Sequence, residues 1–393
     1  MNEFIVFGAG VLAAGVTFAA NWLALGPWRR RRGEHWSEQA RVLFPVTVAA
    51  RSGFLLVPSI FVLSVLLLWP DSSPLWFFTG VAALLGTYVG TIPMDREVFP
   101  RIPRRELWRQ AGIGLLLRFL IWLVFLGAAV GMPNEFGELT IAIGGLAIAL
   151  WVLWSRGGMI WLGRKLGWFR PPTERLQNIV AAASAKMNIP FREVWLMRSP
   201  VAQACAIPGR RQLLFSERLL ELLSDDEVAA VCAHELAHLS ESKATQYSRS
   251  IVLLAYLPWL FFNPMIHTFG FLMFYAMLIN TIAVPYFYRK LSRKLESRAD
   301  RMAQAQEQDA GTYARALTKL YADNLIPAVT AKDRATHPHL YDRILAAGVT
   351  PDFPRPTPAQ AMAGHGHVFS GLAGILFAIF VLRLIHAFGA HGQ

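Results

Sequence analysis

The residues with the clearest chemistry are two histidines, His234 and His238, with Glu235 directly after the first. On a helix of 3.6 residues per turn, two imidazoles four residues apart lie on one face and can bind a single ion. This is the H-E-x-x-H pattern, in which the ion is most often zinc and the glutamate takes a proton from a water molecule. A surface helix with two solvated histidines would give the same short pattern, so the neighbouring elements must decide between the two interpretations.

The sequence around the histidines predicts a buried helix. Ser224 and Glu227 form a capping-box pattern, which predicts that a helix starts here and continues through residues 228–238. Most residues of this helix are small or apolar, and buried imidazoles need a partner that offsets their desolvation. Cys232 is turned away from the proposed ion and is predicted to pack in the core. With Cys205 it makes only two cysteines, too few for a cysteine-rich zinc site or a disulfide framework.

A third metal ligand is predicted much later in the chain, at Glu296. This glutamate and Asp300 are four residues apart, so on a helix Glu296 can bind the ion while Asp300 accepts a hydrogen bond from an imidazole N–H. Glu296 also lies among arginines, and one partner in a charged helix face is the alternative interpretation. The combination with His234 and His238 favours a zinc site with two histidines and one glutamate.

Composition indicates a membrane protein. Of the 393 residues, 54% are hydrophobic and only 16% are charged, and the mean hydropathy is +0.37. Soluble chains carry about 25% charged residues, so this balance predicts a bilayer as the environment. The formal net charge is +12, but the basic residues cluster beside apolar segments, as orientation signals do. We therefore expect no nucleic-acid partner.

About eight transmembrane helices are predicted. The apolar segments cover residues 5–25, 53–69, 75–92, 113–130 and 139–154, a helical hairpin at 250–288, and residues 368–388. Basic and non-basic loops alternate, which predicts an N-terminus outside and a catalytic part in the cytoplasm. Arg118 within the fourth segment is either a functional intramembrane charge or, more economically, a side chain that snorkels to the interface.

Three domains follow from this pattern: a membrane domain at 1–163, a zinc domain at 164–362 that the hairpin interrupts, and a C-terminal membrane helix and tail at 363–393. In the zinc domain we expect helices at 173–187 and 216–223 and strands at 194–197, 202–207 and 212–215, the last two in a hairpin. A sheet edge beside the zinc helix can hold an extended peptide by strand addition. The zinc helix is expected to continue toward the bilayer.

The chain resembles the membrane-bound gluzincin peptidases, which comprise the HtpX-type quality-control proteases and the type I CAAX prenyl proteases. The residues that carry this resemblance are His234-Glu235-Leu236-Ala237-His238, Ser292-Arg293 with Glu296, Ala299 and Asp300, Thr336-His337-Pro338 with Arg343-Ile344, and Ala204-Cys205-Ala206-Ile207-Pro208-Gly209. Together they cover roughly residues 171–350, in a specific order and spacing. Two features depart from the family. Gln203 stands where the family commonly has asparagine, and the five N-terminal spans and the final span are more than the simpler quality-control proteases have.

The resemblance implies a role for each matching residue. It implies that one Zn²⁺ is bound by His234, His238 and Glu296, that Glu235 is the general base, that Asp300 orients a ligating histidine, and that Ala204, Cys205 and Ala206 belong to the substrate-side strand. His337 resembles a position on the substrate side of the cleft, where it could stabilise an oxyanion. Neighbouring His339 competes for that role, and a structural role for either histidine stays open.

The predicted fold class is therefore a mainly α, polytopic membrane protein with a cytoplasmic α+β gluzincin-type zinc protease domain. Its predicted function is cleavage of membrane or membrane-proximal proteins in the inner membrane, in protein quality control, with protein or peptide substrates and the lipid bilayer as partners. One alternative is a processing protease for a particular lipidated or signalling protein. Another is a catalytically silent zinc-binding membrane scaffold, and transport is weaker because no internal repeat is visible. The sequence does not define an oligomeric state.

Overall fold

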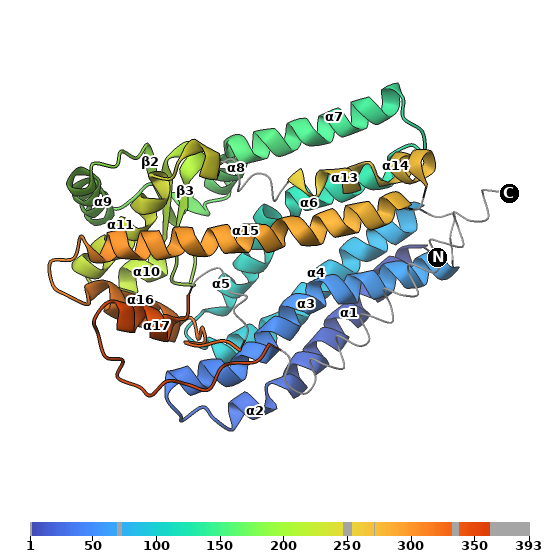
Figure 1. Ribbon diagram of the computed structural model, residues 1–393. Coiled ribbons are helices and arrows are strands. Elements are labelled where there is room, and N and C mark those ends of the chain that lie inside the picture. Colours follow the sequence, from blue (N-terminus) through green and yellow to red (C-terminus); the bar gives the residue numbers. More distant parts are fainter. Residues whose placement is uncertain (1, 69–72, 247–253, 271, 332–337, 362–393) are drawn as a thin grey trace.

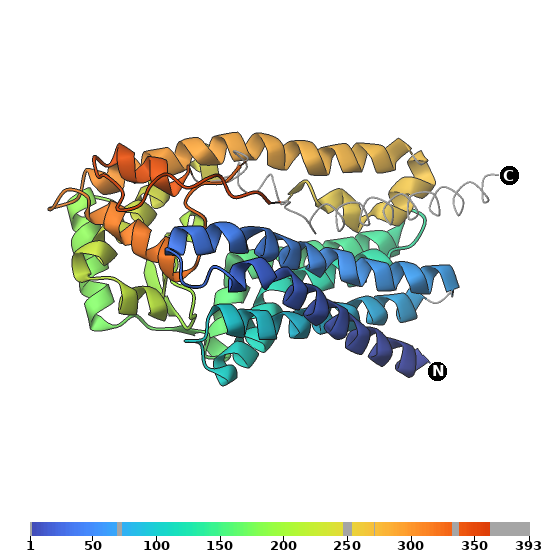
Figure 2. The same cartoon turned by 90° about the horizontal axis from the view of Figure 1, so that it is seen from below.

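The computed structural model describes residues 2–68, 73–246, 254–270, 272–331 and 338–361. Figure 1 shows a set of long helices that extend side by side from a smaller domain of short helices and one sheet. The view from below shows the same division, with the N-terminus at the end of the long helices that is far from the smaller domain (Figure 2).

The N-terminal part is entirely helical within these ranges. Its helices are α1 (Asn2–Ala24), α2 (Gly26–Arg29), α3 (Trp36–Leu68), α4 (Ser73–Val98), α5 (Arg104–Arg109), α6 (Leu115–Val130), α7 (Glu138–Leu153) and α8 (Met159–Lys165). Short π-helical segments join α5 to α6 and α7 to α8. Helices α1 and α4 pack closely because glycines face each other: a Cβ on Gly86 would collide with the backbone of Gly10.

Four helical segments in the described ranges are long and apolar enough to cross a membrane. They are Glu3–Ala24, Trp36–Val62, Leu75–Val98 and Glu138–Lys165, and the pair Arg104–Leu117 and Phe119–Val130, bent by 47°, would be a fifth. The predicted start of the second span, at residue 53, is wrong, because α3 begins at Trp36. The first turns of α3 carry charged side chains, which lower hydropathy without interrupting the helical hydrogen bonds. The predicted final span at 368–388 lies outside the described residues.

The predicted membrane hairpin at 250–288 has a different form. Its first half contains the short helices α13 (Leu257–Leu260) and α14 (Phe262–Phe269), each too short to cross a bilayer. Gly270, with φ of 73°, makes the turn into α15 (Leu272–Gln304). The described residues contain four helices long and apolar enough to cross a membrane, or five with the bent pair, and neither half of the hairpin is among them, so the predicted total of eight is not confirmed.

The sheet has four strands, β1 (Phe169–Arg170), β2 (Glu193–Met197), β3 (Ala204–Ile207) and β4 (Gln212–Ser216), in the order β1-β2-β4-β3. The predicted hairpin of β3 and β4 is confirmed, and its turn is formed by Pro208–Arg210. Strands β2 and β4 are parallel, and β1 was not predicted from the sequence. Strand β3 is therefore an edge strand, and it contacts helix α11.

Helix α11 (Asp225–Leu239) lies at the centre of the smaller domain, between α9 (Glu174–Met187), α10 (Glu217–Leu222), α16 (Thr312–Asp323) and α17 (Leu340–Ala346). One face packs Val228, Cys232 and Leu236 against the sheet and α9, and the other packs Ala230 and Ala233 against α16 and α17. The predicted capping box of Ser224 and Glu227 is present at its N-terminus. Burial on both sides holds the backbone of α11 in one position, which is what a binding site on this helix requires.

Helix α11 does not continue toward the bilayer as predicted. It ends at Leu239, and the Ser240 hydroxyl donates a hydrogen bond to the carbonyl of Ala237. This local bond competes with continuation of the helix, and it lets Glu241 reach back to the last turn.

Candidate metal centre

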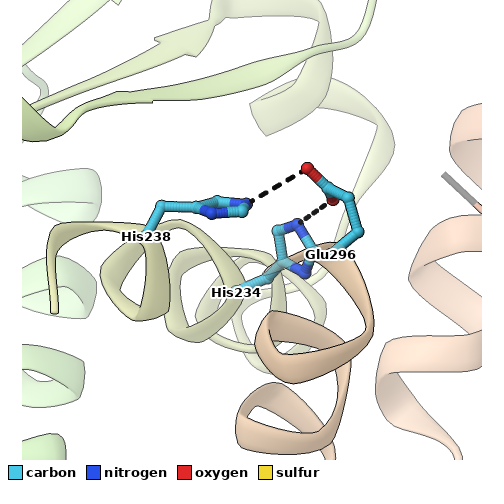
Figure 3. Close-up of side chains that lie close together, drawn as sticks. All are labelled: His234, His238 and Glu296. Carbon is cyan, nitrogen blue, oxygen red and sulfur yellow. Dashed lines mark ion pairs between the residues drawn. The ribbon is translucent and has the colours of Figure 1, made fainter. Parts of the chain in front are cut away.

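His234, His238 and Glu296 converge at the interface of α11 and α15. All three are buried, and one ligand atom from each lies within 4.8 Å of the other two. The Nε2 atom of His234 is 3.4 Å from Oε2 of Glu296, and the Nε2 atom of His238 is 3.6 Å from Oε1 (Figure 3). Both imidazoles therefore present the same ring nitrogen to one carboxylate.

These three residues fit zinc by their chemistry and by their spacing. Two imidazole nitrogens and one carboxylate oxygen are the donor set of many hydrolytic zinc sites, which keep a fourth position for water. Ligand atoms about 2.1 Å from a tetrahedral zinc lie about 3.4 Å apart. The observed nitrogen-to-oxygen distances of 3.4 and 3.6 Å match that separation.

The other ring nitrogen of His234 faces a polar cluster. Its Nδ1 atom is 3.1 Å from Oδ1 of Asp300 and 2.7 Å from the hydroxyl of Tyr313. The same hydroxyl donates to Oδ1 of Asp300 at 2.8 Å, and the Tyr313 ring stacks on the imidazole at 5.7 Å between centroids. Together these contacts set the orientation of the His234 ring, the role that the sequence suggested for Asp300 alone.

Arg343 completes this cluster from helix α17. Its guanidinium donates to Asp300 through Nε at 2.8 Å and Nη2 at 2.6 Å, and Nη2 also donates to the Tyr313 hydroxyl. Burial alone would raise the pKa of Asp300, but the hydrogen bond to His234 and the charge of Arg343 hold that pKa well below its usual range. Asp300 therefore stays ionised although it is buried.

The surroundings of His234 favour a positive charge. Burial lowers the pKa of this imidazole, but its interactions with Asp300 and Glu296 and the negative charge of Glu235 raise it to about 9 in the metal-free protein. The same carboxylates would stabilise a bound cation. Glu235 itself is buried, with 9% of its surface exposed.

His238 has a partner that the sequence analysis missed. Its Nδ1 atom is 2.7 Å from Oε1 of Glu241, whose side chain is buried. The spacing of three residues was the available signal, since it can place both side chains on one side of the chain. Each candidate ligand histidine thus has a carboxylate at Nδ1, an arrangement common around zinc.

The remaining predicted site residues lie at the sheet edge or outside the described part. Ala204, Cys205 and Ala206 belong to edge strand β3, where Cys205 is exposed and Ala206 is buried. His337 lies outside the described residues. His339 is the N-cap residue of α17, and its Nδ1 accepts a hydrogen bond from the backbone N–H of Thr330 at 3.4 Å.

We expect Tyr313→Phe to weaken zinc binding by about 10- to 100-fold, because it removes the hydroxyl that joins His234, Asp300 and Arg343. The measurement is zinc affinity by competition with a chelator. Tyr341→Phe is the control, since this tyrosine packs on Phe353 at the side of the same hydrophobic core, and its hydroxyl has no described contact with His234, Asp300 or Arg343. Equal affinity in both variants would show that the hydroxyl does not position the site.

Part of the chain is similar to known peptidases. Residues 171–348 match the model of peptidase family M48. The chain is 30% identical over 138 residues to a protein named "Protease HtpX homolog" from Trichormus variabilis, and 29% identical over 137 residues to one of the same name from Nostoc sp.. Each match covers 28% of this chain, and the chain spans about half the length of these relatives, 47% in both cases.

The matched segment contains strands β2, β3 and β4, helix α11 and the polar cluster described above. It includes all three candidate ligands, with Glu235, Asp300, Tyr313 and Arg343. Residues 171–348 of this chain are therefore similar to peptidase family M48.

Proposed function

We propose that this protein is an integral-membrane zinc endopeptidase that uses His234, His238 and Glu296 as metal ligands. The observation that carries the proposal is the convergence of these three side chains within 4.8 Å, inside the segment that matches a peptidase family. The apolar helices of the N-terminal part support a membrane location.

In peptide-bond hydrolysis, the zinc ion and the side chains of the protein would have separate roles. Zinc, when bound, supplies a Lewis acid that lowers the pKa of water and polarises a carbonyl. Glu235 accepts the proton of the attacking water and delivers it to the departing amine. Asp300 and Glu241 hold the two imidazoles so that each Nε2 atom faces the ion.

A substrate chain is proposed to bind along β3. Strand β3, which carries Ala204, Cys205 and Ala206, lies at the edge of the sheet, a position to which an extended peptide can add by backbone hydrogen bonds. The contact between β3 and α11 would hold that peptide near the metal ligands. Strand addition of this kind recognises backbone, so it suits substrates of varied sequence.

The protease domain is proposed to face the cytoplasm. Arg101, in the basic loop after α4, donates a hydrogen bond to Asp323 of α16 at 2.7 Å, so this loop and the domain lie at the same end of the long helices. Basic loops stay in the cytoplasm. We retain the proposed division into membrane domain 1–163, protease domain 164–362 and C-terminal segment 363–393.

The apolar half of α15, which is continuous with the turn that carries Glu296, favours membrane or membrane-proximal substrates and a role in quality control. A competing role is the processing of one dedicated protein. Cleavage of several unrelated membrane proteins would support quality control, whereas cleavage of a single one would favour dedicated processing.

Metal removal tests the proposal directly. Full-length protein in neutral detergent should lose proteolysis of a membrane-protein substrate after treatment with a zinc chelator, and stoichiometric zinc should restore it. Casein is the soluble comparison, and we expect the membrane substrate to be cleaved faster. Proteolysis that survives complete metal depletion, verified by elemental analysis, would contradict the zinc mechanism, and equal rates on both substrates would contradict the membrane preference.

A further inference from the structure

A hollow of about 970 Å³ lies far from the metal ligands in the sequence and on other helices. Its lining includes Trp28, Arg32, Gln39, Arg96, Arg104 and Trp108. These residues come from the segment after α1, the start of α3, the end of α4 and the start of α5. The volume is at the upper end of the roughly 300–1,000 Å³ typical of small-molecule sites.

The lining carries a net positive charge, because the carboxylates among the described residues do not neutralise all of its arginines. It contains three arginines and one glutamate, Glu97, so its net formal charge is positive. Glu97 is already engaged, because it pairs with Arg32 and accepts two hydrogen bonds of 2.7 Å from Arg29. Neither Arg96 nor Arg104 forms an ion pair with any carboxylate in the described part of the chain, and both are exposed.

Two tryptophans border this hollow. The guanidinium of Arg32 lies 4.6 Å from the ring centroid of Trp28, which is buried. Trp108 is 55% exposed and faces the surroundings of the protein. Tryptophan is enriched where membrane proteins pass from hydrocarbon to headgroups, since its ring is apolar and its N–H is polar.

The position of the hollow relative to the candidate spans agrees with such an interface. The span Leu75–Val98 ends at it, the helical segments Trp36–Val62 and Arg104–Leu117 begin at it, and the span Glu3–Ala24 ends four residues before its lining residue Trp28. Four helix ends therefore meet at the same level, where a bilayer would present its headgroups. A lipid in the adjacent leaflet can place its phosphate here while its chains stay in the hydrocarbon.

We propose that this hollow binds a phosphate group through Arg32, Arg96 and Arg104, and that an anionic glycerophospholipid supplies it. The planar guanidinium matches phosphate oxygens in a two-pronged geometry, and basic pockets between membrane helices recognise anionic headgroups in this way. Inorganic phosphate has the same chemistry, but the placement at four span ends selects the lipid as the source. This site is independent of the proposed protease activity.

The test is lipid binding by the full-length protein in neutral-detergent micelles, followed by native mass spectrometry. The titrants are phosphatidylglycerol, phosphatidylcholine and inorganic phosphate. Wild type should bind phosphatidylglycerol about tenfold or more tightly than phosphatidylcholine, and Arg96→Gln with Arg104→Gln should remove that preference. The matched control, Arg30→Gln with Arg105→Gln, removes the same charge from exposed arginines of the same segments that do not line the hollow.

Three outcomes decide the proposal. Equal losses in the two double variants would overturn the site, because general attraction to positive charge would then explain binding. Full displacement of the lipid by millimolar inorganic phosphate would overturn the lipid as the source. Arg96→Lys with Arg104→Lys keeps the charge without the guanidinium, so intermediate affinity in this variant supports phosphate recognition even where the glutamine pair folds poorly.

Discussion

Glu235→Gln is expected to retain its zinc and to lose proteolysis by about 10²- to 10⁴-fold, the usual contribution of a positioned general base. The amide keeps the size of the side chain but cannot accept a proton from water at neutral pH. Neither imidazole is changed, and Glu235 is not one of the three converging ligands. The measurement combines zinc content by elemental analysis with the initial rate of cleavage.

The matched control for this variant is Asp226→Asn, which removes an exposed carboxylate from the same helix, two turns before His234. Its rate should stay within about twofold of wild type, since exposed substitutions have small effects. A Glu235→Gln variant that cleaves at the wild-type rate would exclude this residue as the base. If the Glu235→Gln variant has lost its zinc, Glu235 contributes to metal binding instead.

Helix α11 could be predicted from the sequence because its determinants are local. The capping box of Ser224 and Glu227 fixes where the helix begins, and the spacing of His234 and His238 fixes that both lie on one face. The hairpin of β3 and β4 was predictable for the same reason, because its turn residues lie between its strands. Such features depend on neighbours within a few residues.

The polar cluster behind His234 could not be predicted in the same way. Tyr313 lies 79 residues from His234 in the sequence, and Arg343 lies 43 residues from Asp300. From the sequence alone, a tyrosine in an amphipathic helix is expected only to pack in the hydrophobic core. Its contact with His234 is found only once the packing of α16 and α17 on α11 is known. The parallel pairing of β2 with β4 is likewise set by long-range packing, and no sequence pattern within the two strands predicts it.

The long helix α15 shows that a change in hydropathy need not mark the end of a helix. The sequence changes from apolar to basic near Tyr288, and this change suggested the end of a membrane segment. Helical hydrogen bonding does not depend on side-chain polarity, so the helix continues through both compositions to Gln304. The apolar half and the turn with Glu296 therefore form one continuous element.

Glu296→Ala is expected to lower zinc affinity by more than the 10- to 100-fold typical of residues that only support a ligand. It removes the one carboxylate donor among the three converging side chains and leaves two imidazoles on α11. A ligand present at about 1,000 times its Kd stabilises a protein by about 4 kcal/mol, so zinc should raise the unfolding temperature of wild type and leave that of the variant nearly unchanged. Proteolysis should fall with the metal content.

The control for Glu296→Ala is Glu221→Ala, which removes an exposed carboxylate on α10 whose one ion pair among the described residues is with Arg218, at 3.3 Å. Its zinc-induced stabilisation should equal that of wild type, because a surface ion pair contributes about 1 kcal/mol or less and lies away from the ligands. If Glu296→Ala still bound one zinc with wild-type affinity, the third ligand would have to come from another residue. Helix α15 would then pack against α11 without contributing a metal ligand. Its apolar half would not be linked to the catalytic site through Glu296.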